Sequence, residues 1–280
     1  MSTTEHSPSP AAHDARPPRR RTRVPAWLHP RTWAPTAVLV ALLAVAWQAV
    51  AREHPYILPE LGEVGRTLVE EPSLFLENAW TTLFTALIGV LMGAGGAFVL
   101  ALLMSELDVV RRALMPIAVV LNVTPVVAIT PALVVAFGFG MAPKVVVTAL
   151  ITFFPVLINV TTGLRSVPGP VLDVFRTLHA SRLEVLLRVR LPSSLPYTLA
   201  ALRVVLPLSI VGAVVAEFVA AGSAGGLGTM IRNSAATARL DLVYAAIACL
   251  AAMGVTMLAL VTALERRLLF WHESQQDPAR

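Results

Sequence analysis

Several residue types that build catalytic and redox sites are nearly missing from this chain. It has one cysteine, Cys249, so a disulfide framework or a cysteine-based metal cluster is impossible. Its only lysine, Lys144, follows a proline, which excludes the Gly-Lys-Ser/Thr sequence of a phosphate-binding loop. Neither Gly-x-Ser-x-Gly nor His-Glu-x-x-His occurs. The residues therefore give no support to a catalytic role, and we expect no cofactor.

Charged residues are also scarce, at 14% of 280 residues, while 56% are hydrophobic and the mean hydropathy is +0.72. A soluble domain of this length does not need so much apolar surface, so we expect several helices in a lipid bilayer. The formal net charge of +5 would suggest a nucleic-acid partner for a soluble protein. In a membrane protein, basic residues on the cytoplasmic side produce the same excess, so we predict no nucleic-acid partner.

Six apolar segments follow a tail that is rich in arginine, proline and serine. Their bounds are 35–50, 78–104, 113–137, 145–163, 197–221 and 242–264. We therefore divide the chain into a disordered basic tail (1–34), a first span with its outer loop (35–73), a core of five spans (74–264) and a C-terminal tail (265–280). A signal peptide is the alternative for the tail, but no small-residue cleavage site follows it. In the second span, Gly89 and Gly93 form a Gly-x-x-x-Gly pair, which lets another helix approach closely.

The distribution of basic residues predicts the orientation of these spans. With the N-terminus in the cytoplasm, 17 of the 22 lysines and arginines lie in the two tails, in the short segment 105–112, in 164–196 or at Arg203. Such an asymmetry is typical of the positive-inside rule. We therefore expect a multi-pass protein of a bacterial plasma membrane with both termini in the cytoplasm.

Polar residues inside the predicted spans are few, and each has two interpretations. Thr148, Thr152 and Asn159 share one stripe of the fourth span, and Asn122 lies in the third. They either face a water-filled pathway or form hydrogen bonds between packed helices. Glu217 is a lone carboxylate near the outer end of the fifth span, where water can reach it. It is either a gate or half of a structural pair, and the sequence does not separate the two.

The longest polar interval between apolar segments runs from residue 168 to residue 203. Its apolar residues recur at helical spacing, and Ser181 with Glu184 has the form of a capping box, so we expect two short amphipathic helices joined at residues 178–181. We expect the second helix to end at Leu191-Pro192, because proline disfavours helical geometry in the residue before it. The apolar face of such a pair is too small to fold alone and should dock on another surface.

This interval resembles the cytoplasmic coupling loop of ABC-importer permeases. In that family an acidic residue is followed by a Gly-Ala-Ser turn, a second helix and a Leu-Pro close; here Asp173, His179-Ala180-Ser181 and Leu191-Pro192 take those places. His179 replaces the usual glycine at a helix end that often needs a positive φ, and Phe175 replaces a usual small residue. Further similar residues are Phe137-Gly138-Phe139-Gly140, Phe153-Phe154-Pro155, Ala216-Glu217, Gly226-Leu227-Gly228, Leu264-Glu265-Arg266-Arg267 and Trp271.

The resemblance implies an all-α integral membrane protein with six transmembrane helices, like a type I ABC-importer permease with a cytoplasmic coupling-helix loop. It resembles most the branch that serves sulfonate, nitrate, taurine and thiamine-precursor importers. The implied partners are a cytoplasmic ABC ATPase dimer, an extracytoplasmic solute-binding protein and a second permease subunit, with prolines in spans three to five supplying bends. The implied ATPase-coupling residues are Asp173, Arg176, His179, Ala180, Ser181, Glu184, Leu191 and Pro192.

Two other classes of function are weighed against this one. An ion-coupled secondary transporter would need acidic residues near the bilayer midplane, and the predicted spans hold no acidic residue besides Glu217. A membrane enzyme would need a catalytic constellation, which is missing. The solute itself is not encoded by any motif in the sequence.

Overall fold

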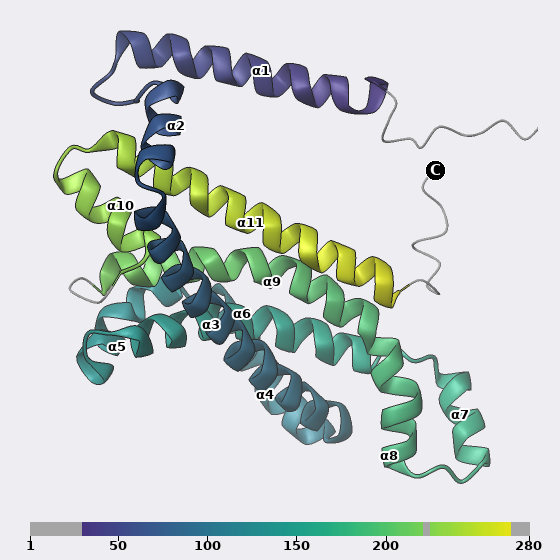
Figure 1. The fold of residues 1–280 in the computed structure, drawn as a ribbon. Helices are drawn as coiled ribbons and strands as arrows, with labels where there is room; N and C mark the ends of the chain where they lie inside the picture. Colours follow the sequence, from purple (N-terminus) through teal and green to yellow (C-terminus); the bar gives the residue numbers. More distant parts are fainter. Residues whose placement is uncertain (1–29, 221–224, 270–280) are drawn as a thin grey trace, which may run out of the picture. The chain divides into compact units, whose positions relative to one another are not determined.

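The computed structural model describes residues 30–220 and 225–269, and within these ranges every regular element is a helix (Figure 1). Of these residues, 30–49 belong to one compact unit, and those from Val50 onward belong to a second. Within the described ranges, five helices are long and apolar enough to cross a membrane, and a sixth crossing results if one bent pair counts as a single span. The predicted all-α membrane fold is confirmed.

The long helices extend beyond the predicted apolar segments at one or both ends. They are α1 (Pro30–Glu53), α3 (Pro72–Glu106), α6 (Met141–Leu164), α9 (Leu191–Val219) and α11 (Leu240–Leu268). The bent pair consists of α4 (Asp108–Val123) and α5 (Thr130–Phe137), with the 3-10 turn η2 (Val126–Ile129) between them. The shorter helices are α2 (Leu61–Glu70), α7 (Gly169–Thr177), α8 (Arg182–Val185), the π-helical segment η3 (Leu186–Arg190) and α10 (Leu227–Ala236).

Both predicted tails fall largely outside the described residues. Residues 1–29 of the expected N-terminal tail and residues 270–280 of the C-terminal tail, with Trp271, are among them. Inside the described range, α1 already begins at Pro30, and α11 continues to Leu268, so each predicted boundary is displaced by a few residues.

The third predicted span is bent by 86° between α4 and the η2–α5 segment. Thr124 has an extended backbone, with φ −73° and ψ 131°, because it precedes Pro125. Pro131 lies in the first turn of α5, where its missing N–H costs no hydrogen bond. The proline-broken helix expected in spans three to five is present in the third span alone among the described residues, since α6 and α9 remain α-helical through Pro155 and Pro207.

Close packing between α3 and α6 holds the centre of the second unit together. A Cβ atom added to Gly89 would lie 2.5 Å from Thr148 Cβ, and one added to Gly93 would collide with the carbonyl oxygen of Ala149 and with Thr152 Oγ1. No side chain larger than hydrogen fits at either position without moving a neighbour. The predicted role of the Gly-x-x-x-Gly pair is confirmed, and its partner is α6.

Two helices that were not predicted from the sequence, α2 and α10, pack with α3 and α11 in one apolar cluster of the second unit. α2 lies in the segment expected to be an acidic loop, and its Val64 is buried in a cluster with Phe75 of α3, residues of α10 and residues of α11. Arg66 and Glu70 form an exposed i,i+4 ion pair on the opposite face of α2. One apolar stripe was therefore enough to make this charge-rich segment an amphipathic helix.

Candidate functional site

The predicted pair of amphipathic helices, α7 and α8, projects from the end of the second unit that lies opposite α5 and α10 (Figure 1). None of the residues of α7 is buried. Asp173 and Arg176 form an exposed ion pair within α7, with 2.8 Å between Oδ1 and Nη1. We call residues 168–190 the coupling segment.

The turn between α7 and α8 is closed by main-chain hydrogen bonds around His179. The Ala180 N–H donates to the Phe175 carbonyl at 3.0 Å, and the His179 N–H donates to the Arg176 carbonyl at 3.0 Å. These two bonds define a Schellman motif, which requires a left-handed residue at the position of His179. His179 has φ 52°, so the predicted positive-φ turn is confirmed.

The start of α8 is fixed by the predicted capping box. The Glu184 N–H donates to Ser181 Oγ at 3.2 Å, and the Ser181 N–H donates to Glu184 Oε2 at 2.9 Å. Each side chain thereby satisfies a main-chain N–H that has no partner within the helix. The Schellman motif and the capping box leave little freedom to the connection between the two helices.

The prediction that Leu191-Pro192 ends the second helix is wrong. α8 passes into the π-helical segment η3 and then into α9, and Leu191 keeps helical dihedrals of −61° and −51°. The Leu191 N–H donates to the Leu186 carbonyl, five residues back. This wider turn precedes Pro192, which lies in the first turn of α9 and lacks an N–H to donate. The coupling segment is thus continuous with a span.

We expect His179→Gly to be neutral or mildly stabilising, by up to about 1 kcal/mol, because glycine adopts the left-handed region without a Cβ penalty. His179→Val should be much worse, since a β-branched residue resists this angle most. Ala238, with φ 56°, offers a matched control: Ala238→Gly should show a similar gain. Thermal unfolding of the purified chain measures both effects. A clearly lower unfolding temperature for His179→Gly than for the wild type would instead assign the imidazole a specific contact.

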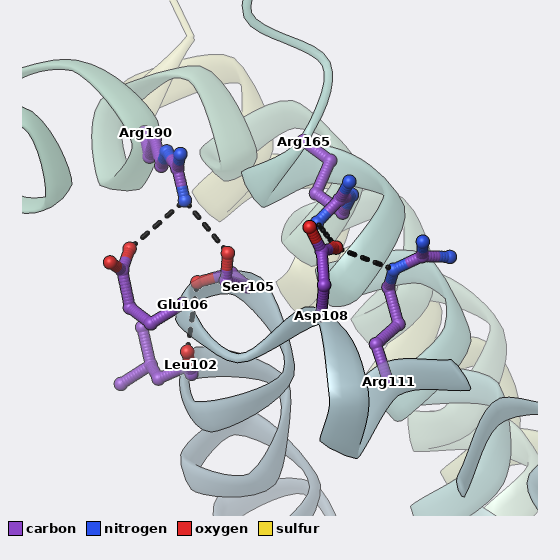
Figure 2. Close-up of polar contacts among 7 residues, drawn as sticks. All are labelled: Leu102, Ser105, Glu106, Asp108, Arg111, Arg165 and Arg190. Carbon is purple, nitrogen blue, oxygen red and sulfur yellow. Dashed lines mark hydrogen bonds and ion pairs between the residues drawn. The ribbon is translucent and has the colours of Figure 1, made fainter. Parts of the chain in front are cut away.

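The coupling segment is tied to the turn between α3 and α4 by charged residues, shown in Figure 2. Arg190 Nη1 donates to the Ser105 carbonyl at 2.8 Å and to Glu106 Oε1 at 2.9 Å. Two residues further along, Asp108 Oδ1 accepts from Arg165 Nη1 at 2.9 Å and from Arg111 Nε at 3.4 Å. We call these five side chains the charged joint: Glu106, Asp108, Arg111, Arg165 and Arg190. It borders a polar cavity lined also by Arg176 and Arg182 of the coupling segment.

Residues 164–196 stood out in the sequence for their basic residues, but the partners of Arg190 among them were not predicted. The sequence did contain a signal for these ion pairs. Glu106 and Asp108 lie in the short segment 105–112, which is expected on the same side of the membrane as the arginines of residues 164–196. Charges confined to two loops on one side are candidates for ion pairs, but the sequence alone does not assign them.

The proposed pathway residues do not gather in one place. Thr148 and Thr152 are fully buried against Gly89 and Gly93, and their hydroxyl groups donate to carbonyls of their own helix. They pack α6 against α3 rather than facing water. Asn159, which is half-buried, likewise donates to the Pro155 carbonyl at 2.8 Å. Asn122 is exposed beside the bend of the third span.

Glu217 is fully buried, so the expectation that water reaches it is wrong for the described residues. Its carboxylate accepts from Thr82 Oγ1 at 3.0 Å and from the Gly228 N–H at 2.7 Å. Thr82 Oγ1 also accepts from the Leu227 N–H at 2.9 Å. The carboxylate therefore lies at the N-terminus of α10, where free N–H groups and the helix dipole favour a negative charge.

Neighbouring residues extend this cluster, which the sequence analysis did not predict. Asn78 Oδ1 accepts from the Gly226 N–H at 2.8 Å, and Lys144 Nζ donates to the Gly225 carbonyl at 3.1 Å. Gly226 has φ 115°, and a Cβ added there would collide with Glu217. The sequence contained one indication of this cluster: Asn78 and Thr82 are four residues apart, so their polar side chains share one face of α3.

The geometry defines a multi-pass helical membrane protein with a short helical pair projecting from one end of its bundle. Residues 89–270 match the family model described as binding-protein-dependent transport system inner membrane component. The chain belongs to this family, in the branch of importer permeases for sulfonates, nitrate, taurine and thiamine precursors. It is a transport subunit.

Two relatives illustrate this membership, and one solved structure has a similar fold. The chain is 36% identical over 223 residues to a probable ABC transporter permease protein of Haemophilus influenzae, covering 79% of this chain and 90% of the relative. It is 35% identical over 237 residues to the formylaminopyrimidine transport permease protein ThiX of Halalkalibacterium halodurans, covering 84% and 94%. Its fold is similar to a chain of the inward-facing MetNI methionine ABC transporter, with a TM-score of 0.59 at 17% identity, covering 71% and 98%.

Proposed function

We propose that the chain is the permease of an ATP-driven importer and that α7 and α8 are its docking element for a separate cytoplasmic ATPase. The observation that carries this proposal is the exposed apolar surface of the pair. Leu178 is 70% exposed and Leu183 is 63% exposed, on a segment that projects from the bundle instead of packing within it. Exposed apolar side chains beside charged ones are typical of an interaction site.

The position of the pair also suits transmission of movement. The turn is held by a Schellman motif and a capping box, and η3 joins it to α9 without a break. A rigid element that is continuous with a span can pass a displacement of the ATPase to the membrane part. Asp173, Arg176, His179, Ala180, Ser181, Glu184, Leu191 and Pro192 remain our proposed residues for this contact.

We expect Leu183→Glu to abolish retention of the ATPase while leaving the chain abundant in the membrane. A charge placed in an apolar contact costs about 2 kcal/mol or more, roughly thirtyfold in affinity. Co-purification of the ATPase, normalised to the amount of permease, measures the effect. The matched control is Val69→Glu on α2, because Val69 is 78% exposed and lies outside the coupling segment. Wild-type retention by the Leu183→Glu chain would overturn the docking role.

We propose the remaining parts of the assembly from the family membership and from the distribution of basic residues along the chain. The coupling segment and the charged joint would face the cytoplasm, with both termini on that side of the bacterial plasma membrane. A second copy of the chain would complete the pathway, and an extracytoplasmic solute-binding protein would deliver the solute. The solute is proposed to be small and anionic or heterocyclic, such as a sulfonate, nitrate or thiamine precursor, as the names of the relatives suggest.

The alternative of an ion-coupled secondary transporter loses its one candidate residue. The carboxylate of Glu217 is engaged by Thr82 and Gly228 and has no exposed surface, so it offers no open site for a coupling ion. Transport that stops when the ATPase is removed would separate the importer from this alternative.

A further inference from the structure

The charged joint contains an ion pair that connects the coupling segment to a different span. Arg190 lies at the end of η3, whereas Ser105 and Glu106 lie in the last turn of α3, more than 80 positions earlier in the chain. The other ion pair of the coupling segment, Arg176 with Asp173, stays within α7. Arg190 therefore connects the coupling segment to α3, whereas Arg176 makes its ion pair within α7.

The environment of Arg190 makes this contact more than an ordinary surface pair. Exposed ion pairs contribute little, because water and salt screen the charges. The side chains of Arg190 and Glu106 are only 23% and 28% exposed, compared with 78% and 64% for Arg176 and Asp173. The same guanidinium nitrogen also binds the Ser105 carbonyl near the C-terminus of α3, where a positive charge is favoured by the helix dipole.

A second ion pair continues the connection from the turn to a third span. Asp108, at the start of α4, binds Arg165, which directly follows the last residue of α6. Leu107 alone separates Glu106 of α3 from Asp108 of α4. The two bridges therefore attach the same three-residue turn to η3 on one side and to the end of α6 on the other, as Figure 2 shows.

We propose that Arg190 is a positioning residue that makes the α3–α4 turn move together with the coupling segment when the ATPase closes. This inference rests on the proposed function. The path through η3 into α9 reaches one span, and the Arg190 bridge adds α3 and α4. Asp108 and Arg165 then hold α6 to the same turn. A displacement of the coupling segment thus reaches α9 through η3, and it reaches α3, α4 and α6 through the joint.

The test is a distance measurement in the full permease–ATPase complex. Spin labels are attached to Gly169→Cys in the coupling segment and Val109→Cys in α4, in a Cys249→Ser background; both label sites are exposed. The distance between the labels is recorded without nucleotide and after trapping with ATP and vanadate. We expect the same distance in both states for the wild-type joint, and a shifted or broadened distance after trapping in Arg190→Gln. The ratio of transport to ATP hydrolysis should fall on the order of fivefold in that variant.

Arg203→Gln is the matched control, because Arg203 pairs with Glu265 at 3.8 Å and joins α9 to α11 without touching the α3–α4 turn. It should keep the label distance unchanged. Glu106→Gln, which keeps an acceptor oxygen but loses the charge, provides a second variant if Arg190→Gln fails to assemble. An unchanged label distance in an assembled Arg190→Gln or Glu106→Gln complex would overturn the inference.

Failure of the proposed function gives a different result from failure of this inference. A wild-type chain that recruits no ATPase overturns both. A complex that assembles and hydrolyses ATP, with labels that move apart even in the wild type, overturns the role of Arg190 alone. The Leu183→Glu variant loses the ATPase, whereas Arg190→Gln is expected to keep it and lose the coordinated movement.

Discussion

Gly93→Ala is expected to destabilise the membrane bundle severely, although it adds a single methyl group. The new Cβ would collide with the Ala149 carbonyl oxygen and would lie 2.9 Å from Ala149 Cα, and both are main-chain atoms of α6. Main-chain atoms of a continuous helix cannot rotate away, so α3 and α6 would have to separate. Overpacking of this kind costs about 1–3 kcal/mol and occasionally more. The loss exceeds the gain of roughly 1 kcal/mol that alanine brings to a helix.

The same helix provides the control for this prediction. Gly95 is exposed, and a Cβ added there meets no atom within 4 Å. Gly95→Ala should therefore be neutral or slightly stabilising. Thermal unfolding in detergent and abundance in the membrane measure both variants, and Gly93→Leu should abolish accumulation altogether. Equal unfolding temperatures for Gly93→Ala and Gly95→Ala would show that α3 and α6 do not pack through Gly93.

Features set by a few neighbouring residues were predictable from the sequence. The spans followed from apolar length, the capping box from Ser181 and Glu184, and the positive φ of His179 from its position between two short helices. Each of these signals acts over one or two turns of the chain. For the same reason, Gly89 and Gly93 predicted a close helix contact, although not that α6 would be the partner.

Features that depend on distant parts of the chain were not predictable. Proline predicts a disturbance wherever it occurs, but Pro125 sits at an 86° bend while Pro155 and Pro207 lie in continuous helices. Packing against neighbouring helices decides among these outcomes. Likewise, Pro192 was expected to end a helix, and the wider π-helical turn before it allows the helix to continue. The Arg190–Glu106 and Thr82–Glu217 bonds join residues 84 or more positions apart, which no local pattern encodes.

Glu217 illustrates how tertiary contacts change the interpretation of a residue. In the sequence it is a lone carboxylate in a span, which is a functional hypothesis by default. In the structure it closes the N-terminus of α10 and binds Thr82 of α3, while Lys144 binds the neighbouring Gly225 carbonyl. The Gly226-Leu227-Gly228 sequence is explained by the same contact, since a Cβ at either glycine would lie too close to the carboxylate. These contacts favour the structural role over the gate.

Glu217→Ala should therefore lower the stability and the membrane abundance of the chain before it changes transport. Removing the carboxylate leaves the Gly228 N–H and the Thr82 hydroxyl without their acceptor in a buried place, and each unsatisfied group costs about 1–3 kcal/mol. Glu217→Gln should lose less stability, because its amide oxygen still accepts one of these hydrogen bonds. Glu70→Ala is the control: it removes an exposed carboxylate that pairs with Arg66 on α2, and such a pair contributes little.

Transport measured per assembled complex distinguishes the two roles of Glu217. If the carboxylate only anchors α10 to α3, the Glu217→Gln chains that do assemble transport solute at the wild-type rate, and the deficit lies in their number. Thermal unfolding of the purified complex should show the order wild type, Glu217→Gln, Glu217→Ala from most to least stable. Wild-type abundance and stability combined with lost transport in Glu217→Gln would identify a gate, because the anchoring contacts would then be intact while the charge itself was needed.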